Sequence, residues 1–214
     1  MSFGPLPVAD SRPVARPRVH RRRVTKSAGR RDVMALASLL LAYPDDAMTE
    51  LQTQLADAVG ALPASAAASD LREFVEWFVN TDAAQRRIDY VKTFDHRRRS
   101  ALYVTFAPYG DSRTRGDALA DLRRRYNDAG FFENSDELPD YLPTVLQFAA
   151  QVSESEADAV LAQSRVGIES IHEALRAHRS PYASVLRAVI RCLPGEVSSP
   201  EPLQAAPDLE GVLA

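Results

Sequence analysis

Three short stretches of the sequence gather charged side chains whose spacing could support chemistry. They are DHRRR (residues 95–99), YGDSRTRGDAL (residues 109–119) and ELPDY (residues 137–141). The middle stretch resembles a phosphate-binding loop, but such a loop needs four residues between its glycines and a lysine after the second glycine. Here five residues separate Gly110 from Gly116, and Asp117 follows, which would repel a phosphate. The sequence therefore excludes a P-loop.

Catalytic and metal-binding patterns are equally weak. The carboxylates of Glu137 and Asp140 could transfer protons as a pair, but a helix N-terminus also attracts acids, and this structural role is the better interpretation. His172 and His178 lie six residues apart on one helical segment, which is the wrong spacing for joint metal ligation. Cys192 is the one cysteine of the chain, and we expect it to fill core space. The sequence predicts no enzyme, no bound metal and no cofactor.

Charge is distributed unevenly along the chain. Residues 1–31 carry nine Arg or Lys side chains against one acid, whereas residues 32–214 carry 17 basic and 28 acidic side chains. We expect a disordered basic arm over residues 1–30. Such an arm could contact nucleic acid, acidic lipid or the acidic body of the same chain. It has no aromatic residue beyond Phe3 and no motif of a known nucleic-acid reader, so no nucleic-acid partner is expected.

The body of the chain shows helical periodicity nearly throughout. Apolar residues recur at the spacing of one helix face, as in Leu71, Phe74, Val75 and Phe78. No segment alternates convincingly with the two-residue period of a strand. We predict an all-α fold, a single-domain helical bundle over residues 31–194, followed by a flexible acidic tail over residues 195–214.

The apolar run Val33–Ala42 follows Arg30 and Arg31, an arrangement that resembles an export signal. However, Asp32 interrupts it, no small-residue cleavage site follows, and ten apolar residues are too few to cross a bilayer. We predict a buried first helix and no membrane insertion. The lack of a second cysteine also fits a cytoplasmic protein.

Helix boundaries can be predicted from local residues. Asp70 is expected to cap the helix that contains Leu71. Ser153 and Glu156 form a capping box that should open a long helix. This helix should turn a seam of small and apolar residues toward its neighbours, at the spacing of a bundle: Ala157, Leu161, Ser164, Ile168, Ile171 and Leu175.

Three further expectations concern the middle of the chain. Ser100–Ala107 could suit a strand, but because no partner strand is predicted we expect a buried helix that ends at Pro108. Gly116 costs about 1 kcal/mol relative to alanine inside a helix, so we expect a neighbouring helix or a bound chain to approach it closely. Gly130 should end that helix in a Schellman motif that brings Phe131 against Tyr126.

Three blocks of the sequence resemble a known family. They are YVKTFDHRRRSALYVTF (residues 90–106), YGDSRTRGDALADLRRRYNDAG (residues 109–130) and ELPDYLPTVLQFAA (residues 137–150), and LLLAYPDD (residues 39–46) matches as well. These blocks look like the respiratory nitrate reductase assembly chaperones, the NarJ-type or nitrate reductase delta subunit family. The resemblance implies an all-helical, cytoplasmic chaperone of the wider TorD-like class. The family's motifs fall here on Asp95, Arg98, Gly110, Asp111, Arg113, Arg115, Gly116, Glu137, Pro139, Asp140 and Pro143.

The resemblance implies binding and no catalysis. Members of this family hold the apo catalytic (alpha) subunit of nitrate reductase, including its N-terminal segment, for insertion of the molybdenum cofactor, and delay its docking to the membrane. The chaperone itself carries no cofactor, and its oligomeric state stays open. Gln147 departs from the family, which usually has Glu at this position, so no charged role is expected there.

Binding an amphipathic client segment requires an apolar groove with charged rims. We expect Arg113 and Arg115, with Glu137 and Asp140, to frame such a groove. The full set of expected client-binding residues is Asp95, Arg98, Asp111, Arg113, Arg115, Glu137, Asp140 and Tyr141. Two alternatives remain: a chaperone for trimethylamine oxide or dimethyl sulfoxide reductase, and a helical nucleic-acid-associated protein that acts through its basic arm.

Overall fold

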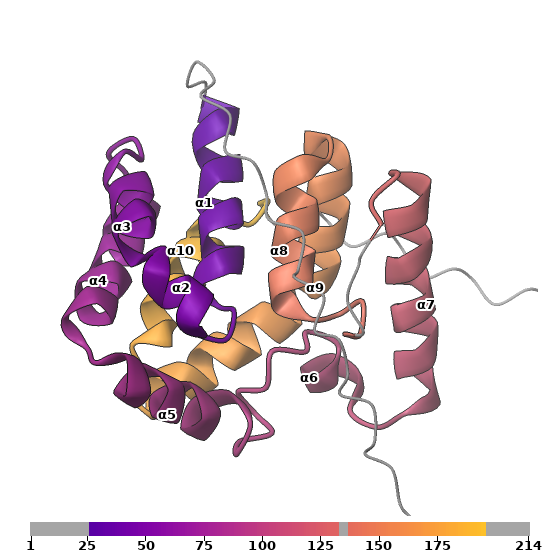
Figure 1. The fold of residues 1–214 in the computed structure, drawn as a ribbon. Helices are drawn as coiled ribbons and strands as arrows, with labels where there is room; N and C mark the ends of the chain where they lie inside the picture. Colours follow the sequence, from indigo (N-terminus) through magenta and orange to yellow (C-terminus); the bar gives the residue numbers. More distant parts are fainter. Residues whose placement is uncertain (1–25, 133–136, 196–214) are drawn as a thin grey trace, which may run out of the picture.

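The computed structural model describes residues 26–132 and 137–195, so most of the expected basic arm and acidic tail lies outside the described residues. Within these ranges the chain forms ten helices and no strand (Figure 1). The helices are α1 (Lys26–Leu40), α2 (Asp46–Glu50), α3 (Gln52–Gly60), α4 (Ala66–Asn80), α5 (Ala83–Phe94), α6 (Phe106–Tyr109), α7 (Arg113–Asp128), α8 (Leu142–Gln151), α9 (Glu154–Ala177) and α10 (Tyr182–Arg191). The predicted all-α fold is confirmed.

Helix α10 lies at the centre of the packing. It packs against α1, α4 and α9, while α8 fills the space between α1 and α9 (Figure 1). Tyr182, in the first turn of α10, is 1% exposed, and its ring contacts Phe74 of α4 and Tyr90 and Phe94 of α5. A helix that is buried on most sides forms a core that several elements share.

The apolar run after Arg30 and Arg31 is a buried helix, as predicted. Val33, Met34 and Ala37 are nearly inaccessible. Helix α1 begins at Lys26, five residues earlier than expected, and the side chains of Arg30 and Arg31 hydrogen-bond to carbonyl oxygens of other helices' ends. No helix in the described part of the chain is long and apolar enough to cross a membrane.

Both predicted helix-end motifs are confirmed. The Ser153 hydroxyl accepts from the Glu156 backbone N–H, and the Glu156 side chain accepts from the Ser153 backbone N–H. Gly130 has φ +69°, and the Phe131 N–H donates to the Tyr126 carbonyl at 2.8 Å, the long bond of a Schellman motif. All six residues of the predicted α9 seam are buried: Ala157, Leu161, Ser164, Ile168, Ile171 and Leu175.

The prediction that Asp70 caps a helix is wrong. Helix α4 begins at Ala66, and the Ser65 hydroxyl caps it by accepting from the Ala68 N–H. Asp70 lies inside the helix and is 6% exposed. Its two carboxylate oxygens accept from Arg187 at 2.8 Å and Arg191 at 2.6 Å, so the acid joins α4 to α10.

The prediction of a buried helix over Ser100–Ala107 is also wrong. Residues 97–105 form a series of turns, and the short helix α6, which contains Pro108, begins at Phe106. The partner that the sequence did not reveal is the segment before α8. The Val104 N–H donates to the Asp140 carbonyl at 3.0 Å, and the Leu142 N–H donates to the Leu102 carbonyl at 2.7 Å. Because the pairing is only two hydrogen bonds long, neither segment needs the alternating apolar pattern by which a strand is recognised in a sequence.

Close backbone approach occurs at a different glycine from the one expected. A Cβ added to Gly116 would meet no atom within 4 Å, so no neighbouring helix approaches it. A Cβ added to Gly167 of α9 would lie 1.9 Å from the carbonyl oxygen of Val104. Gly167 therefore allows the Leu102–Thr105 turns to lie directly on α9.

His172 of α9 makes stability depend on pH. Its side chain is 12% exposed, and its Nε2 atom is buried with no hydrogen-bond partner among the described residues. Burial lowers the pKa of His172; Glu173 and Asp70 oppose this shift, while Arg176 and Arg187 reinforce it. The folded protein therefore keeps His172 neutral at a pH where the unfolded chain protonates it.

We expect the free energy of unfolding to fall as pH drops below about 6.5, the ordinary His pKa, and to stop falling on this account below the lowered pKa. The variant His172→Gln should reduce this loss, as measured by urea unfolding between pH 7.5 and 5. His178→Gln, at the exposed end of α9, is the matched control. An unchanged pH dependence in His172→Gln would assign the loss to other groups.

Candidate client-binding surface

The backbone pairing of residues 102–104 with residues 140–142 joins the three charged stretches. It places the DHRRR turn, the α6–α7 junction and the segment before α8 in one region of the molecule. The Tyr126 hydroxyl of α7 also donates to the Pro139 carbonyl at 2.8 Å, which holds α7 against the same segment. Six of the eight expected site residues take part in contacts within this region, and Asp95 and Arg113 lie beside it.

Asp140 does not lie on an exposed rim, contrary to expectation. Its side chain is 0% exposed, and its Oδ2 atom accepts from the Thr105 hydroxyl at 2.5 Å and the Thr105 N–H at 3.2 Å. The Arg115 guanidinium lies 3.4 Å from the same oxygen and also donates to the Thr105 hydroxyl at 3.0 Å. Asp140 therefore joins the segment before α8 to α6 and α7 from inside the protein.

Two arginines lie near the ring of Phe106 at the start of α6. The guanidinium of Arg98 lies 4.5 Å from the centre of its ring, and that of Arg115 lies 5.8 Å away. Arg98 also forms an ion pair with Asp111, in which both side chains are largely exposed. These contacts hold Arg98 and Asp111 at the surface, whereas the Asp140 carboxylate of the same region is buried.

Tyrosines connect this region to the N-terminal half of the molecule. The Tyr103 hydroxyl donates to a carboxylate oxygen of Glu137 at 2.8 Å, and the Tyr103 and Tyr141 rings lie 5.7 Å apart. The hydroxyls of Tyr141 and Tyr90 lie 3.4 Å apart. Burial raises the pKa of Tyr141, and burial together with the hydrogen bond to Glu137 raises the pKa of Tyr103. Both phenols are therefore neutral at physiological pH.

Asp95 and Arg113 are exposed at helix ends. Asp95 follows the last turn of α5, and Arg113 begins α7. Neither side chain forms a hydrogen bond or an ion pair with other described residues. Their charges are therefore available to a partner.

Sequence reasoning missed three residues of this region. Thr105, Phe106 and Tyr103 hold the charged groups in place, yet they were assigned to an expected helix. The aromatic and hydroxyl residues of YVTF (residues 103–106) could have suggested a role in positioning, because they follow directly on the DHRRR turn.

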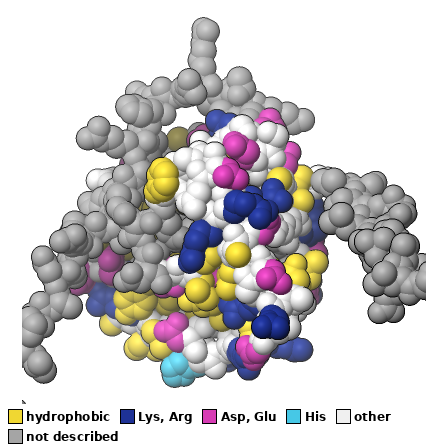
Figure 2. Space-filling model, turned by 90° about the vertical axis from the view of Figure 1, so that its right-hand side faces the viewer, with side chains coloured by type: hydrophobic (Ala, Val, Ile, Leu, Met, Phe, Trp, Pro, Cys, Tyr) yellow, Lys and Arg dark blue, Asp and Glu magenta, His cyan; other side chains and the backbone are white. Residues whose placement is uncertain are grey.

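Apolar side chains are exposed beside the charged groups. Tyr109, two residues before Asp111, is 37% exposed, and Leu138, next to Glu137, is 40% exposed. Figure 2 shows the face that carries α6 and α7, where hydrophobic, basic and acidic side chains lie next to one another. No group of three His, Cys, Asp or Glu side chains in the described ranges could hold a metal ion. Charged groups of both signs therefore lie next to exposed apolar side chains on this surface.

Comparison with known proteins identifies the family. The model of the nitrate reductase delta subunit family matches residues 43–188. The nitrate reductase molybdenum cofactor assembly chaperone NarJ of Escherichia coli (strain K12) is 35% identical over 58% of this chain and 53% of its own length. A Bacillus subtilis (strain 168) protein named as a NarJ chaperone of the same kind is 33% identical over 73% of this chain and 85% of its own length.

A solved structure shares the fold. The crystal structure of a redox enzyme maturation protein from Archaeoglobus fulgidus superposes with a TM-score of 0.59 at 16% identity, over 82% of this chain and 98% of that protein. At this identity the likeness concerns the fold. The two relatives described above carry the names of chaperones and not of catalysts, which confirms the prediction of a non-enzymatic protein. The chain belongs to the nitrate reductase delta subunit family.

Proposed function

We propose that this protein is a chaperone of respiratory nitrate reductase that binds the apo catalytic (alpha) subunit, including its N-terminal segment. It holds that subunit for insertion of the molybdenum cofactor and releases it for attachment to the membrane when the cofactor is in place. It acts in the cytoplasm and carries no cofactor of its own.

The observation that carries this proposal is the match of residues 43–188 to the delta subunit family, with relatives named as cofactor assembly chaperones. The structure adds a surface suited to such a role. Arg98, Asp111 and Arg113 present charges of both signs near the exposed Tyr109. Ion pairs can orient a client segment there while apolar contacts supply affinity.

The burial of Asp140 changes which residues test the proposal. Reversing the charge of a fully buried acid would damage the fold, so a loss of binding would be uninformative. Exposed residues avoid this difficulty. We therefore assign client contact to Arg113 and Glu137, and assign Asp140 and Arg115 to the positioning of the surface.

We expect the variants Arg113→Glu and Glu137→Lys each to weaken capture of the apo alpha subunit by roughly tenfold, because each replaces an attractive contact with a repulsive one. The measurement is affinity purification from nitrate-respiring cells, with quantification of the captured subunit. Far-ultraviolet circular dichroism should be unchanged.

Arg176→Glu and Glu173→Lys are matched controls, since both side chains are exposed near the C-terminal end of α9. They should capture the alpha subunit like the unmodified protein. Normal capture by both test variants would show that the client binds elsewhere. A strain that lacks the protein and still makes fully active nitrate reductase would contradict the proposed function itself.

A further inference from the structure

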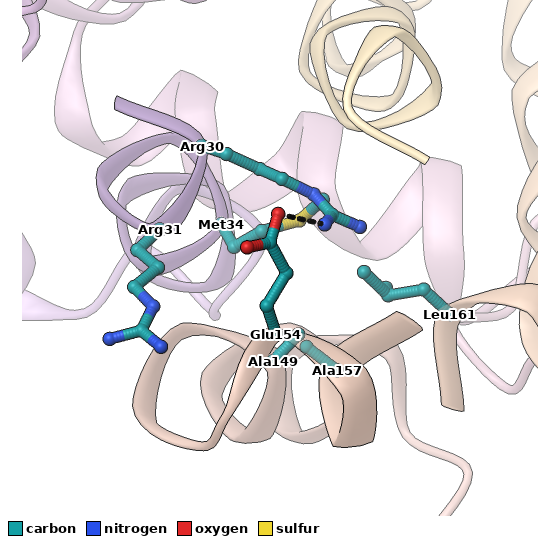
Figure 3. A pocket seen from close by; sticks show the side chains of 7 residues that line it. All are labelled: Arg30, Arg31, Met34, Ala149, Glu154, Ala157 and Leu161. Carbon is teal, nitrogen blue, oxygen red and sulfur yellow. Dashed lines mark ion pairs between the residues drawn. The ribbon is translucent and has the colours of Figure 1, made fainter. Parts of the chain in front are cut away.

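A small hollow lies between α1, α8 and α9, away from the α6–α7 surface (Figure 3). Met34 of α1, Ala149 of α8, and Ala157 and Leu161 of α9 form its apolar walls. The hollow is also lined by the charged residues Arg30, Arg31 and Glu154. The hollow therefore combines an apolar floor with charges of both signs at its edge.

Arg30, the last residue of the expected basic arm, and Arg31, which follows it, already contact the body of the protein here. The Arg30 guanidinium donates to the Cys192 carbonyl at 2.7 Å and lies 2.5 Å from Asp158 and 3.8 Å from Glu154. Arg31 donates to the Val152 carbonyl at 2.8 Å. Arg30 and Arg31 are thus held by the first turns of α9, by Val152 before it and by the end of α10.

The carboxylates in the first turn of α9 can bind more cations than Arg30 alone. The Glu154 side chain is 62% exposed and lies at the longer distance from Arg30. Glu156 lies two residues further along α9, on another side of the helix, where it is exposed and its side chain completes the capping box. Both carboxylates can accept further cations from the solvent side.

The sequence directly before α1 supplies such cations. Residues 16–26 read RPRVHRRRVTK, with three consecutive arginines at positions 21–23 and a valine at position 24. Lys26 precedes Arg30 by one helical turn, about 6 Å along the axis. Arg23 precedes Lys26 by three residues, at most about 10 Å of extended chain. The chain is therefore long enough to bring Arg23 back to the level of Arg30, beside which Glu154 lies.

We infer that residues 16–24 fold back onto the start of α9 of the same chain, where Arg21–Arg23 pair with Glu154 and Glu156 and Val24 covers the hollow. The tether favours this occupant over a separate partner, because a covalently attached segment is present at a high effective concentration. The charges are complementary, and the contacts of Arg30 and Arg31 begin the same interface. The inference does not depend on the proposed client.

A spin label on the full-length chain tests this inference. A nitroxide is attached at position 19 through Val19→Cys in a Cys192→Ser background, and the methyl NMR signals of the body are recorded. We expect the methyl signals of Ala149 and Ala157 to broaden more strongly than those of Leu175, which lies about 27 Å from Ala157 along α9. The variant Glu154→Lys, or salt raised to about 0.5 M, should reduce this broadening at least roughly threefold.

Glu173→Lys is the matched control, an exposed glutamate on the same helix that should leave the broadening unchanged. Equal broadening in the Glu154→Lys and unmodified chains would overturn the inference. So would broadening that arises between chains, which a mixture of spin-labelled chains with isotope-labelled chains that carry no spin label would reveal. Release of the broadening by added duplex DNA at moderate ionic strength, with no effect of Glu154→Lys, would instead assign the arm to nucleic acid and likewise overturn it.

Discussion

The variant Gly167→Ala should lower the free energy of unfolding by about 3 kcal/mol or more. The new methyl carbon would lie 1.9 Å from the Val104 carbonyl oxygen and 2.6 Å from its carbonyl carbon. The obstructing atoms belong to backbone and cannot rotate away. Residues 102–105 would have to move off α9, and their hydrogen bonds to residues 140 and 142 would be strained. Urea unfolding followed by circular dichroism measures the loss.

Gly116→Ala is the matched control for Gly167→Ala. It makes the same chemical change in a helix interior, but the added carbon would meet nothing within 4 Å. Alanine is favoured over glycine in a helix by about 1 kcal/mol, so this variant should be slightly stabilised. Similar effects of the two variants would contradict the close contact between Val104 and α9.

Features that depend on neighbouring residues were predictable from the sequence. The buried face of α4, the seam of α9, its capping box and the Schellman motif at Gly130 all follow from residue spacing within one helix. Such patterns are local, and the apolar stripe of a helix points to the core wherever that core is.

Features that depend on distant residues were not predictable in the same way. Asp70 looks like a cap from its neighbours, yet Arg187 and Arg191, more than 100 residues away, make it a buried link between helices. The turns after Ser100 look helical because their partner, Asp140–Leu142, contributes two hydrogen bonds and no strand pattern. The need for glycine at position 167 could not be predicted, because the group that packs against it is a backbone carbonyl, which leaves no pattern in the sequence.

The same distinction between local and distant contacts applies to the candidate surface. The resemblance to the family identified the blocks that meet at the α6–α7 surface, but it could not separate exposed from buried members. Arg98 belongs to the first block and Asp140 to the third, yet the Arg98 side chain is 66% exposed and the Asp140 side chain is 0% exposed. The packing of residues 102–105 over residue 140 decides which charged side chain reaches the surface, and neither block contains this information alone.

Asp140→Ala should destabilise the protein by about 3 kcal/mol or more, because it leaves the Thr105 N–H and hydroxyl and the Arg115 guanidinium without their acceptor in a buried place. The measurement is again urea unfolding. Asp128→Ala, at the exposed end of α7, is the control and should change stability by no more than about 0.5 kcal/mol. A small effect at Asp140 would contradict its assignment as the buried link.

A double-mutant cycle separates the loss of the acid from the charge that it leaves behind. Arg115→Met removes the guanidinium while it retains an apolar side chain of similar length. In the Asp140→Ala background this second change removes a partly buried cation without a counterion, so it should cost less than in the unmodified protein, by about 1 kcal/mol or more. Additive effects would mean that solvent, rather than Asp140, satisfies Arg115, and that the two residues hold α7 independently. A coupled result would mean that Asp140 and Arg115 act together, and that their interaction fixes the position of the exposed charges of α6 and α7 relative to Glu137.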